Sequence, residues 1–267
     1  MADRPPLILI PPSEGKADGG AGDPWTAGTM SFASLDAARA RVQRSLGAAM
    51  KAKIADRQKL LGVKGVALAS ATATNLGVGV APTMPAIERY TGVLYDALDA
   101  ASLSKRDRTR LDEQVVIFSG LWGLVRPTDP IPDYKLKMGG SLKATGRLGS
   151  WWKPRLDAAI ADELVERTVW NLLPNEHDAA WSGASAATAV VSVRFLDEVG
   201  TGADAKLIVV SHWNKLLKGA LVRHVLAHQL TDVDGLADFE HPEGYRYRPD
   251  LTVRDGNQIA VSLVARR

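Results

Sequence analysis

Short apolar runs alternate with helical stretches along this chain of 267 residues, and this alternation constrains the fold most strongly. Leu7–Ile10 is stopped by two prolines, and Val115–Phe118 leads into a loop rich in glycine and proline at 119–140. Runs of this kind are typical of buried strands. Further strands are expected at 168–172, 187–195 and 206–211, and helices at 32–59, 66–76, 85–100, 151–167 and 212–230. The alternation predicts an α/β fold, with a mixed β-sheet flanked by helices.

Domain organisation follows from the length of the chain and from the absence of linkers. The sequence contains neither an internal repeat nor a low-complexity segment. We therefore expect one domain over residues 1–267, with a helical insertion at about 34–78. At the end of the chain, 244–253 and 258–264 flank an Asp-Gly-Asn turn, which predicts a C-terminal β-hairpin.

The chain contains no cysteine, which excludes a disulfide scaffold, a thiolate metal site and a cysteine nucleophile. Its most apolar uncharged stretch, Val115–Val125, is far shorter than the roughly 20 residues of a membrane-spanning helix. The first residues lack the basic and then apolar pattern of a secretory signal. We therefore expect a soluble, cytoplasmic protein with no membrane partner.

Basic residues are segregated along the chain. Eight bases and one acid fall within 39–64, six bases and no acid within 134–156, and four bases and no acid within 205–231. These windows hold 18 of the 33 basic residues but only one of the 30 acidic ones. If the windows meet in space, they form a positive face that attracts polyanions; otherwise each is a solvated helix or loop.

Common catalytic motifs are incomplete in this sequence. The Pro11–Lys16 loop follows a strand, but it lacks the first glycine and the final hydroxyl residue of a phosphate-binding P-loop. Ser119 lacks the flanking glycines of a nucleophile elbow, and no dinucleotide-binding glycine pattern follows the first strand. His224 and His228 lie four residues apart without the acidic neighbour of a zinc-protease motif. We therefore expect neither a metal site nor a cofactor.

The segment 116–139, VIFSGLWGLVRPTDPIPDYKLKMG, carries the most informative motif. It resembles the signature of the bacterial YaaA peroxide-stress family over about twenty positions, too many for a chance match of a short motif. Other blocks of the same family follow in the same order along the chain, at Pro12–Lys16, Tyr90–Tyr95, Asn171–His177, Lys215–Arg223 and Gly244–Tyr245. The chain departs from the family pattern at Leu173, Pro174, His177 and Lys218.

The resemblance implies an α/β fold particular to that family and a positively charged cleft that binds double-stranded DNA. It also implies a small helix-hairpin-helix element and a role in limiting peroxide damage that is linked to free iron. Replacement of the family arginine by Lys218 keeps the charge but loses bidentate phosphate geometry.

Polar side chains cluster after two of the expected strands. Ser13 and Lys16 follow the first strand, and Ser119 and Arg126 follow the strand at 115–118. Because ligand crevices in α/β proteins form at the carboxyl ends of strands, neighbouring strands would bring these groups into one phosphate or nucleotide pocket. The candidate catalytic residues are Ser13, Lys16, Ser119, Arg126, Asp129, Glu176 and Lys215.

Two helical features are candidates for contacts with a phosphate backbone. The Gly-Val-Lys-Gly turn within 60–69 predicts a helix-hairpin-helix element or, equally, an ordinary helical corner. The expected helix at 212–230 brings three basic side chains near one another, with a solvated helix face as the alternative. The candidate residues for phosphate or nucleic-acid binding are Ser13, Lys16, Gly62, Lys64, Gly65, Tyr90, Tyr95, Arg126, Tyr134, Lys135, Lys215, Lys218 and Arg223.

The sequence leaves two functional hypotheses open. The first is a peroxide-stress protein that binds double-stranded DNA without sequence preference, which the charge segregation and the resemblance favour. The second is an enzyme acting on a nucleobase, a nucleotide or a nucleic acid in the same phosphate-binding pocket. The polar groups of the matched blocks favour this second hypothesis, since they exceed what backbone contacts require.

Overall fold

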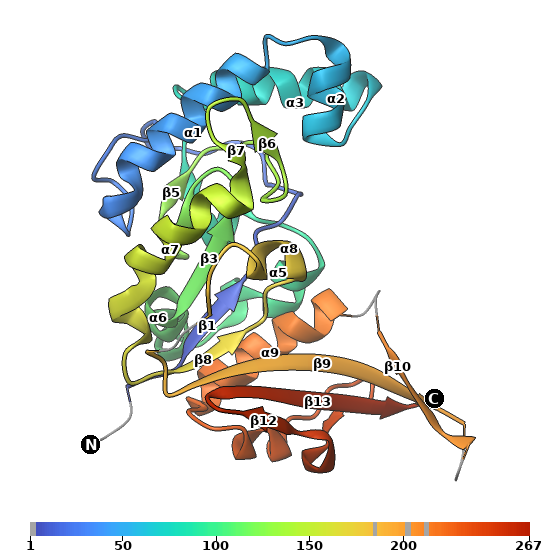
Figure 1. The fold of residues 1–267 in the computed structure, drawn as a ribbon. Coiled ribbons are helices and arrows are strands. Elements are labelled where there is room, and N and C mark those ends of the chain that lie inside the picture. Colours follow the sequence, from blue (N-terminus) through green and yellow to red (C-terminus); the bar gives the residue numbers. More distant parts are fainter. Residues whose placement is uncertain (1–3, 184–185, 201–203, 211–213) are drawn as a thin grey trace.

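The architecture is a mixed β-sheet flanked by helices (Figure 1), which confirms the predicted α/β fold. The computed structural model describes residues 4–183, 186–200, 204–210 and 214–267. The strands of the main sheet are β1 (Leu7–Ile10), β3 (Val115–Ser119), β4 (Gly123–Val125), β8 (Thr168–Asn171), β9 (Ala189–Val199), β10 (Lys206–Val209), β11 (Arg246–Tyr247), β12 (Val253–Asp255) and β13 (Gln258–Arg266). Within the described residues their order is β11-β13-β9-β8-β1-β3-β4, with β10 paired to β9 and β12 to β13.

The first strand of the chain lies in the centre of this sheet. All four residues of β1 are fully buried, as expected for an uninterrupted apolar run. β1 pairs in parallel with β3, where Ile10 faces Ile117, and with β8, where Leu9 faces Asn171. The carboxyl ends of β1, β3 and β8 therefore lie side by side at the same end of the strands, and the loops that follow them lie close together.

Helices and short hairpins surround the sheet. The helices are α1 (Asp36–Ala49), α2 (Ile54–Leu61), α3 (Gly65–Gly77), α4 (Ala86–Arg89), α5 (Val93–Leu98), α6 (Lys105–Gln114), α7 (Leu148–Leu164), α8 (Asn175–Asp178) and α9 (Asn214–His228). Two small antiparallel pairs join β2 (Met84–Pro85) to β5 (Pro130–Ile131) and β6 (Ser141–Leu142) to β7 (Gly146–Arg147). None of the helices in the described ranges combines the length and the apolar character needed to cross a bilayer.

The helical insertion, α1 to α3, lies at one end of the molecule (Figure 1). A buried arginine anchors it to the sheet. The fully buried guanidinium of Arg39 donates to the carbonyl oxygens of Trp122, just before β4, and Leu124, within β4, at 3.0 and 2.7 Å. It also donates to the carbonyl oxygen of Ser31 and forms an ion pair with Asp36 at 2.8 Å. These bonds satisfy the buried charge, and they fix α1 against the edge of the sheet that ends in β4.

Close packing of α9 against α5 depends on Gly219. A Cβ atom at this position would lie 2.3 Å from the carbonyl oxygen of Leu94 and 2.8 Å from the Cβ of Ala97, both on α5. Because only glycine permits this approach, α9 is buried on the face toward α5 as well as on the face toward the sheet. This double burial determines the environment of the basic residues on α9.

Several elements differ from the sequence-based expectations. The helix expected at 32–59 is two helices, since α1 ends at Ala49 and α2 begins at Ile54. The expected loop at 119–140 contains β4, which pairs antiparallel with β3 and reverses the chain. The expected continuous strand at 244–253 is interrupted at Pro249, which has no amide hydrogen for a ladder and begins a short 3-10 helix. Residues 211–213, where we expected a strand to end and a helix to begin, lie outside the described residues.

Candidate functional site

A pocket lies where the segments that follow β1, β5 and β8 meet. It has a volume of about 130 Å³ and is lined by Pro12, Ser13, Glu14, Lys16, Tyr134, Lys135, Leu136, Lys137, Glu176 and His177. We call it the Lys16 pocket. A neighbouring hollow of about 230 Å³ shares four of these residues, and residues of α3 line its other side. The sequence thus places residues from three distant segments around one small cavity.

The Lys16 side chain packs over aromatic rings and has a single hydrogen-bond partner among the described residues. Its amine donates to the carbonyl oxygen of Ser13 at 3.1 Å and lies 4.2 Å from the ring centroid of Tyr134. The ring of Tyr90 is further away, at 5.6 Å. Burial lowers the pKa of Lys16 to about 8, because the charged amine loses water that these rings do not replace. A fraction of the amine is therefore neutral near physiological pH.

A chain of hydroxyl groups supports the base of the pocket. The Tyr134 hydroxyl lies 2.7 Å from Ser119 Oγ and 2.7 Å from the Tyr90 hydroxyl. Ser119 Oγ in turn accepts a hydrogen bond from the backbone N–H of Trp122 at 3.0 Å. Burial raises the pKa of Tyr134 to about 12, so this phenol remains protonated and can both donate and accept hydrogen bonds. Tyr95 also belongs to this layer, where its hydroxyl donates to the carbonyl oxygen of Pro11 at 2.9 Å.

Glu14 is held by two lysines rather than by Lys16. Its carboxylate forms ion pairs with Lys137 at 2.8 Å and with Lys135 at 3.3 Å. The hydrogen bond from Lys137 lowers the pKa of Glu14, and the same bond raises the pKa of Lys137. Asp133 and Glu14 both favour the charged form of Lys16 electrostatically, but neither forms an ion pair with it among the described residues.

His177 is unusual because neither ring nitrogen has a hydrogen-bond partner among the described residues, although both are buried. Burial lowers the pKa of His177 to about 4, so the ring is neutral near pH 7. Buried polar atoms without a partner are rare in folded proteins, and a bound ligand or water often satisfies them. The neighbouring carboxylate of Glu176 instead accepts from the backbone N–H of Gly139 at 2.6 Å.

The loop that carries the pocket lysines is tied to α3. Asn75 of α3 donates to the carbonyl oxygen of Lys135 at 2.9 Å and accepts from its backbone N–H at 2.8 Å. Lys137 also approaches the turn between α2 and α3, because a Cβ atom at Gly62 would lie 3.8 Å from its amine. The Gly62–Gly65 turn and the Lys16 pocket are therefore neighbours.

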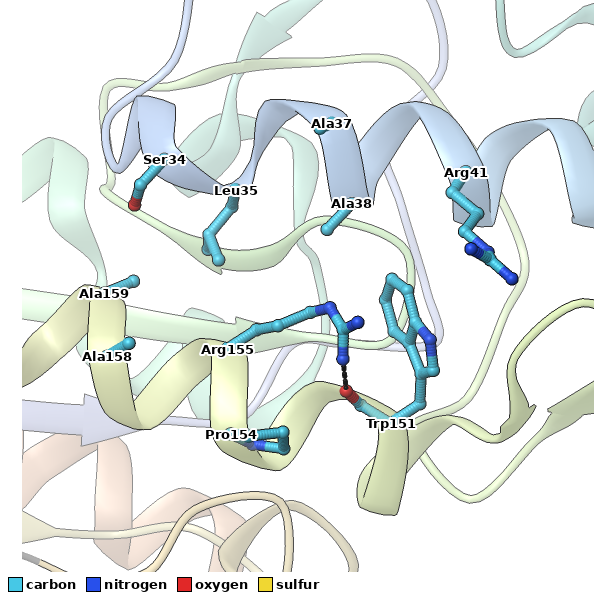
Figure 2. Close-up of a pocket in the computed structure, with 10 residues that line it drawn as sticks. All are labelled: Ser34, Leu35, Ala37, Ala38, Arg41, Trp151, Pro154, Arg155, Ala158 and Ala159. Atoms are coloured by element: carbon cyan, nitrogen blue, oxygen red, sulfur yellow. Dashed lines mark hydrogen bonds between the residues drawn. The ribbon is translucent and has the colours of Figure 1, made fainter.

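A larger hollow of about 490 Å³ lies between α1 and α7 (Figure 2). Its two arginines are already engaged with the protein. Arg155 donates to the carbonyl oxygen of Trp151 at 2.6 Å and stacks over the Trp151 ring at 4.0 Å, while Arg41 donates to the carbonyl oxygen of Ala144. Because this hollow is open and its cations have partners, the Lys16 pocket is the better candidate site.

Comparison with known proteins agrees with the motif blocks described above. The family model described as "Peroxide stress protein YaaA" matches residues 7–251. The chain belongs to this family. A relative, the UPF0246 protein SCO2297 of Streptomyces coelicolor, is 39% identical over 224 residues, which is 83% of each chain. The UPF0246 protein CE1889 of Corynebacterium efficiens is 34% identical over 261 residues, covering 97% of this chain and 99% of the relative.

The structure brings together only part of the site that we predicted for this YaaA-family chain. Ser13, Lys16, Tyr134, Lys135 and Glu176 line the Lys16 pocket. Ser119, Tyr90 and Tyr95 lie beneath it, and all three are buried in the hydroxyl layer. The expected convergence is therefore correct for the residues that follow β1 and for Ser119.

The expected position of Arg126 was wrong. Its guanidinium donates to the carbonyl oxygens of Glu113 and Val115 and pairs with Glu163 at 2.7 Å. Val115 is the first residue of β3 and Ser119 is the last. Arg126 therefore lies at the end of the strands opposite to Ser119. Asp129 accepts from the backbone N–H of Arg126 and from Ser31, and it stabilises this loop rather than the pocket.

The basic residues of α9 do not share one surface, contrary to our expectation. Lys215 is exposed, whereas Lys218 is buried and donates to the carbonyl oxygen of Leu172 at 2.8 Å. Burial lowers the pKa of Lys218 to about 8. Arg223 donates to the carbonyl oxygens of Leu98 and Asp99, where it caps the end of α5. Lys218 therefore faces the segment that follows β8, whereas Arg223 faces the end of α5.

Sequence reasoning missed three residues that line the pocket. Glu14 appeared only inside the matched block Pro12–Lys16, Lys137 was counted only as a charge, and His177 was noted only as a departure from the family pattern. The position of His177 directly after the candidate Glu176, in a loop that follows a strand, was a usable signal. Of the turn residues, Gly62 and Lys64 lie between α2 and α3, Gly65 begins α3, and Gly62 adopts a left-handed φ of 68°. The helix-hairpin-helix element stays a prediction.

Proposed function

We propose that this protein is a cytoplasmic peroxide-stress protein that binds double-stranded DNA without sequence preference. One observation carries the proposal: the turn between α2 and α3 lies beside the loop that presents Lys135 and Lys137. A phosphate backbone that approaches this turn would meet lysine side chains on one side and backbone N–H groups on the other. The family described above supports the link to peroxide stress.

The surface of α3 facing the pocket suits close approach of a backbone. Its residues there are small, namely Ala67, Ser70, Ala71 and Thr74. Lys64, which precedes α3, is exposed and free to reach a phosphate. Because such contacts recognise phosphates rather than bases, binding should be independent of sequence and should weaken steeply with salt.

Fluorescence anisotropy with a labelled duplex tests the proposal. We expect a dissociation constant on the order of 10⁻⁴–10⁻⁶ M at physiological salt, as is common for sequence-independent binding. A plot of log K against the logarithm of the salt concentration has a negative slope. Lys64→Gln and Lys137→Gln should each make this slope shallower by about 0.9. Lys206→Gln on β10, which lies far from α2 and α3 (Figure 1), is the matched control and should leave the slope unchanged. Affinity that does not depend on salt, or equal losses in all three variants, would refute DNA binding at this surface.

The Lys16 pocket favours a second function, an enzyme that acts on a nucleotide or on a nucleic acid. The supporting observation is the combination of a desolvated amine at Lys16 with the unpartnered imidazole of His177. Such groups exceed the needs of backbone binding and are common in active sites. Lys16→Met separates the two functions: if duplex binding survives while a small phosphorylated ligand no longer raises the melting temperature, the pocket is a distinct site.

A further inference from the structure

The amine of Lys16 has the surroundings of a nucleophile rather than those of a structural cation. Structural buried lysines are usually paired with a carboxylate. Lys16 forms no ion pair among the described residues, and Glu14 is occupied by Lys135 and Lys137. Among the described residues the Lys16 amine has one hydrogen-bond partner, the carbonyl oxygen of Ser13, and it lies over the Tyr134 ring at the wall of the pocket.

His177 supplies the second half of the arrangement. Its neutral imidazole has one nitrogen that carries a proton and one that carries a lone pair, and no residue in the described part of the chain bonds to either. Both Lys16 and His177 line the same pocket. A ligand hydroxyl or carbonyl oxygen bound there would satisfy the ring and could exchange a proton with it.

The size and charge of the pocket restrict the ligand. Its volume of about 130 Å³ is well below the roughly 300–1,000 Å³ of sites that enclose a drug-sized molecule. It therefore suits an opened sugar better than a complete nucleotide. Lys135 and Lys137 at the rim suit a phosphate attached to that sugar.

We propose that Lys16 forms a Schiff base with the aldehyde of a phosphate-bearing sugar held in this pocket. The inference rests on the proposed phosphate-binding function and names its substrate class. The same chemistry has two sources, which are an abasic deoxyribose within a DNA strand and a free phosphorylated aldose. Lysine amines that are desolvated in enzyme pockets are established nucleophiles toward such carbonyl groups.

The reaction balances without an oxidant or a reductant. The nitrogen lone pair of the neutral amine attacks the aldehyde carbon, a C–N bond forms, and the oxygen receives a proton to give a carbinolamine. The hydroxyl group then leaves with a proton as water, and a C=N bond replaces the C–O bond. The His177 imidazole is placed to carry the proton between nitrogen and oxygen. The sum is one amine plus one aldehyde giving one imine plus one water.

Reductive trapping of the full-length protein tests the proposal. The protein is incubated with a duplex that contains one abasic site or, in a second arm, with erythrose 4-phosphate, then reduced with cyanoborohydride and mapped by mass spectrometry. We expect one adduct per chain, on Lys16. Below the pKa of Lys16, each unit by which the pH is raised should speed adduct formation by up to about tenfold, since only the neutral amine reacts. His177→Asn should slow trapping by on the order of tenfold.

Three variants keep the test decisive. Lys16→Arg keeps the charge but cannot form the adduct. Lys16→Met, which removes the charge, cannot form it either and takes its place if the larger arginine disturbs folding. Lys51→Arg, at an exposed lysine at the end of α1, should trap like the wild type. An adduct in the abasic arm alone identifies DNA as the source, and an adduct with the sugar phosphate alone identifies a free metabolite. Adducts scattered over surface lysines, or an adduct that persists in Lys16→Arg, would overturn the proposal.

The failure of this inference can be separated from the failure of DNA binding. Anisotropy with an intact duplex reports binding without an aldehyde. If the intact duplex binds but neither arm gives an adduct at Lys16, the Schiff base is wrong and DNA binding stands. If the duplex does not bind but the sugar phosphate traps at Lys16, DNA binding is wrong and the chemistry of the pocket stands.

Discussion

Replacing Lys16 with methionine should stabilise the protein even though it removes the central group of the pocket. Burial lowers the pKa of Lys16 from 10.5 to about 8. At about 1.36 kcal/mol per pKa unit, the charged amine destabilises the folded state by about 3 kcal/mol near pH 7. Loss of the hydrogen bond to Ser13 offsets about 1 kcal/mol of the gain. The net expectation is that Lys16→Met raises the free energy of unfolding by about 2 kcal/mol.

The dependence on pH distinguishes this explanation from simple packing. Because the folded-state pKa is below the unfolded one, the destabilisation is complete below about pH 8 and disappears as the pH rises toward 10.5. The advantage of Lys16→Met should therefore shrink to about zero near pH 10. Urea unfolding followed by circular dichroism at several pH values measures it, with Lys51→Met at an exposed site as the matched control. A variant that is less stable than the wild type, or an advantage that does not change with pH, would show that the Lys16 amine is not desolvated.

Three further substitutions test the packing described above. Arg39→Met should lower the free energy of unfolding by about 3–5 kcal/mol in urea titrations, because buried carbonyl groups lose their donor; a loss below about 1 kcal/mol would contradict the anchoring role. Gly219→Ala should cost about 1–3 kcal/mol and lower the melting temperature by several degrees, since the new Cβ atom meets Leu94; an unchanged melting temperature would argue against this contact. Ser119→Ala should destabilise by about 1 kcal/mol through the lost bond to Tyr134, whereas Ser119→Thr, which keeps the hydroxyl, should recover part of it; equal losses would exclude the hydroxyl chain as the cause.

The pattern of apolar runs was sufficient to predict the centre of the fold. β1 and β3 were recognisable as buried strands, and their parallel pairing placed Ser13, Lys16 and Ser119 at one edge. The same reasoning failed for Arg126, because β4 was not recognised inside a loop rich in glycine and proline. β4 runs back along β3. Arg126, seven positions after Ser119, therefore lies near Val115 at the other end of β3.

Burial that depends on a distant partner was not predictable from local spacing. Lys215 and Lys218 are three residues apart, which places them near one another on a helix. Lys218 is nevertheless buried and bonds to the carbonyl oxygen of Leu172, which follows β8, whereas Lys215 is exposed. The close contact of α9 with α5 at Gly219 was equally hidden, since a single glycine in a helix does not indicate which element packs against it. His177 was missed for a similar reason, since its isolation from water arises from loops far apart in the sequence.

The central position of β1 has a consequence for how the chain folds. The strand synthesised first requires partners that begin at Val115 and Thr168, more than a hundred residues later. The parallel pairing of β9 with β13 likewise joins Ala189–Val199 to Gln258–Arg266. Contacts of such long range make folding slow, because β1 can pair only once these distant strands have been made. Until then the apolar strand Leu7–Ile10 remains exposed, so a cell that produces this protein quickly must protect that segment from aggregation.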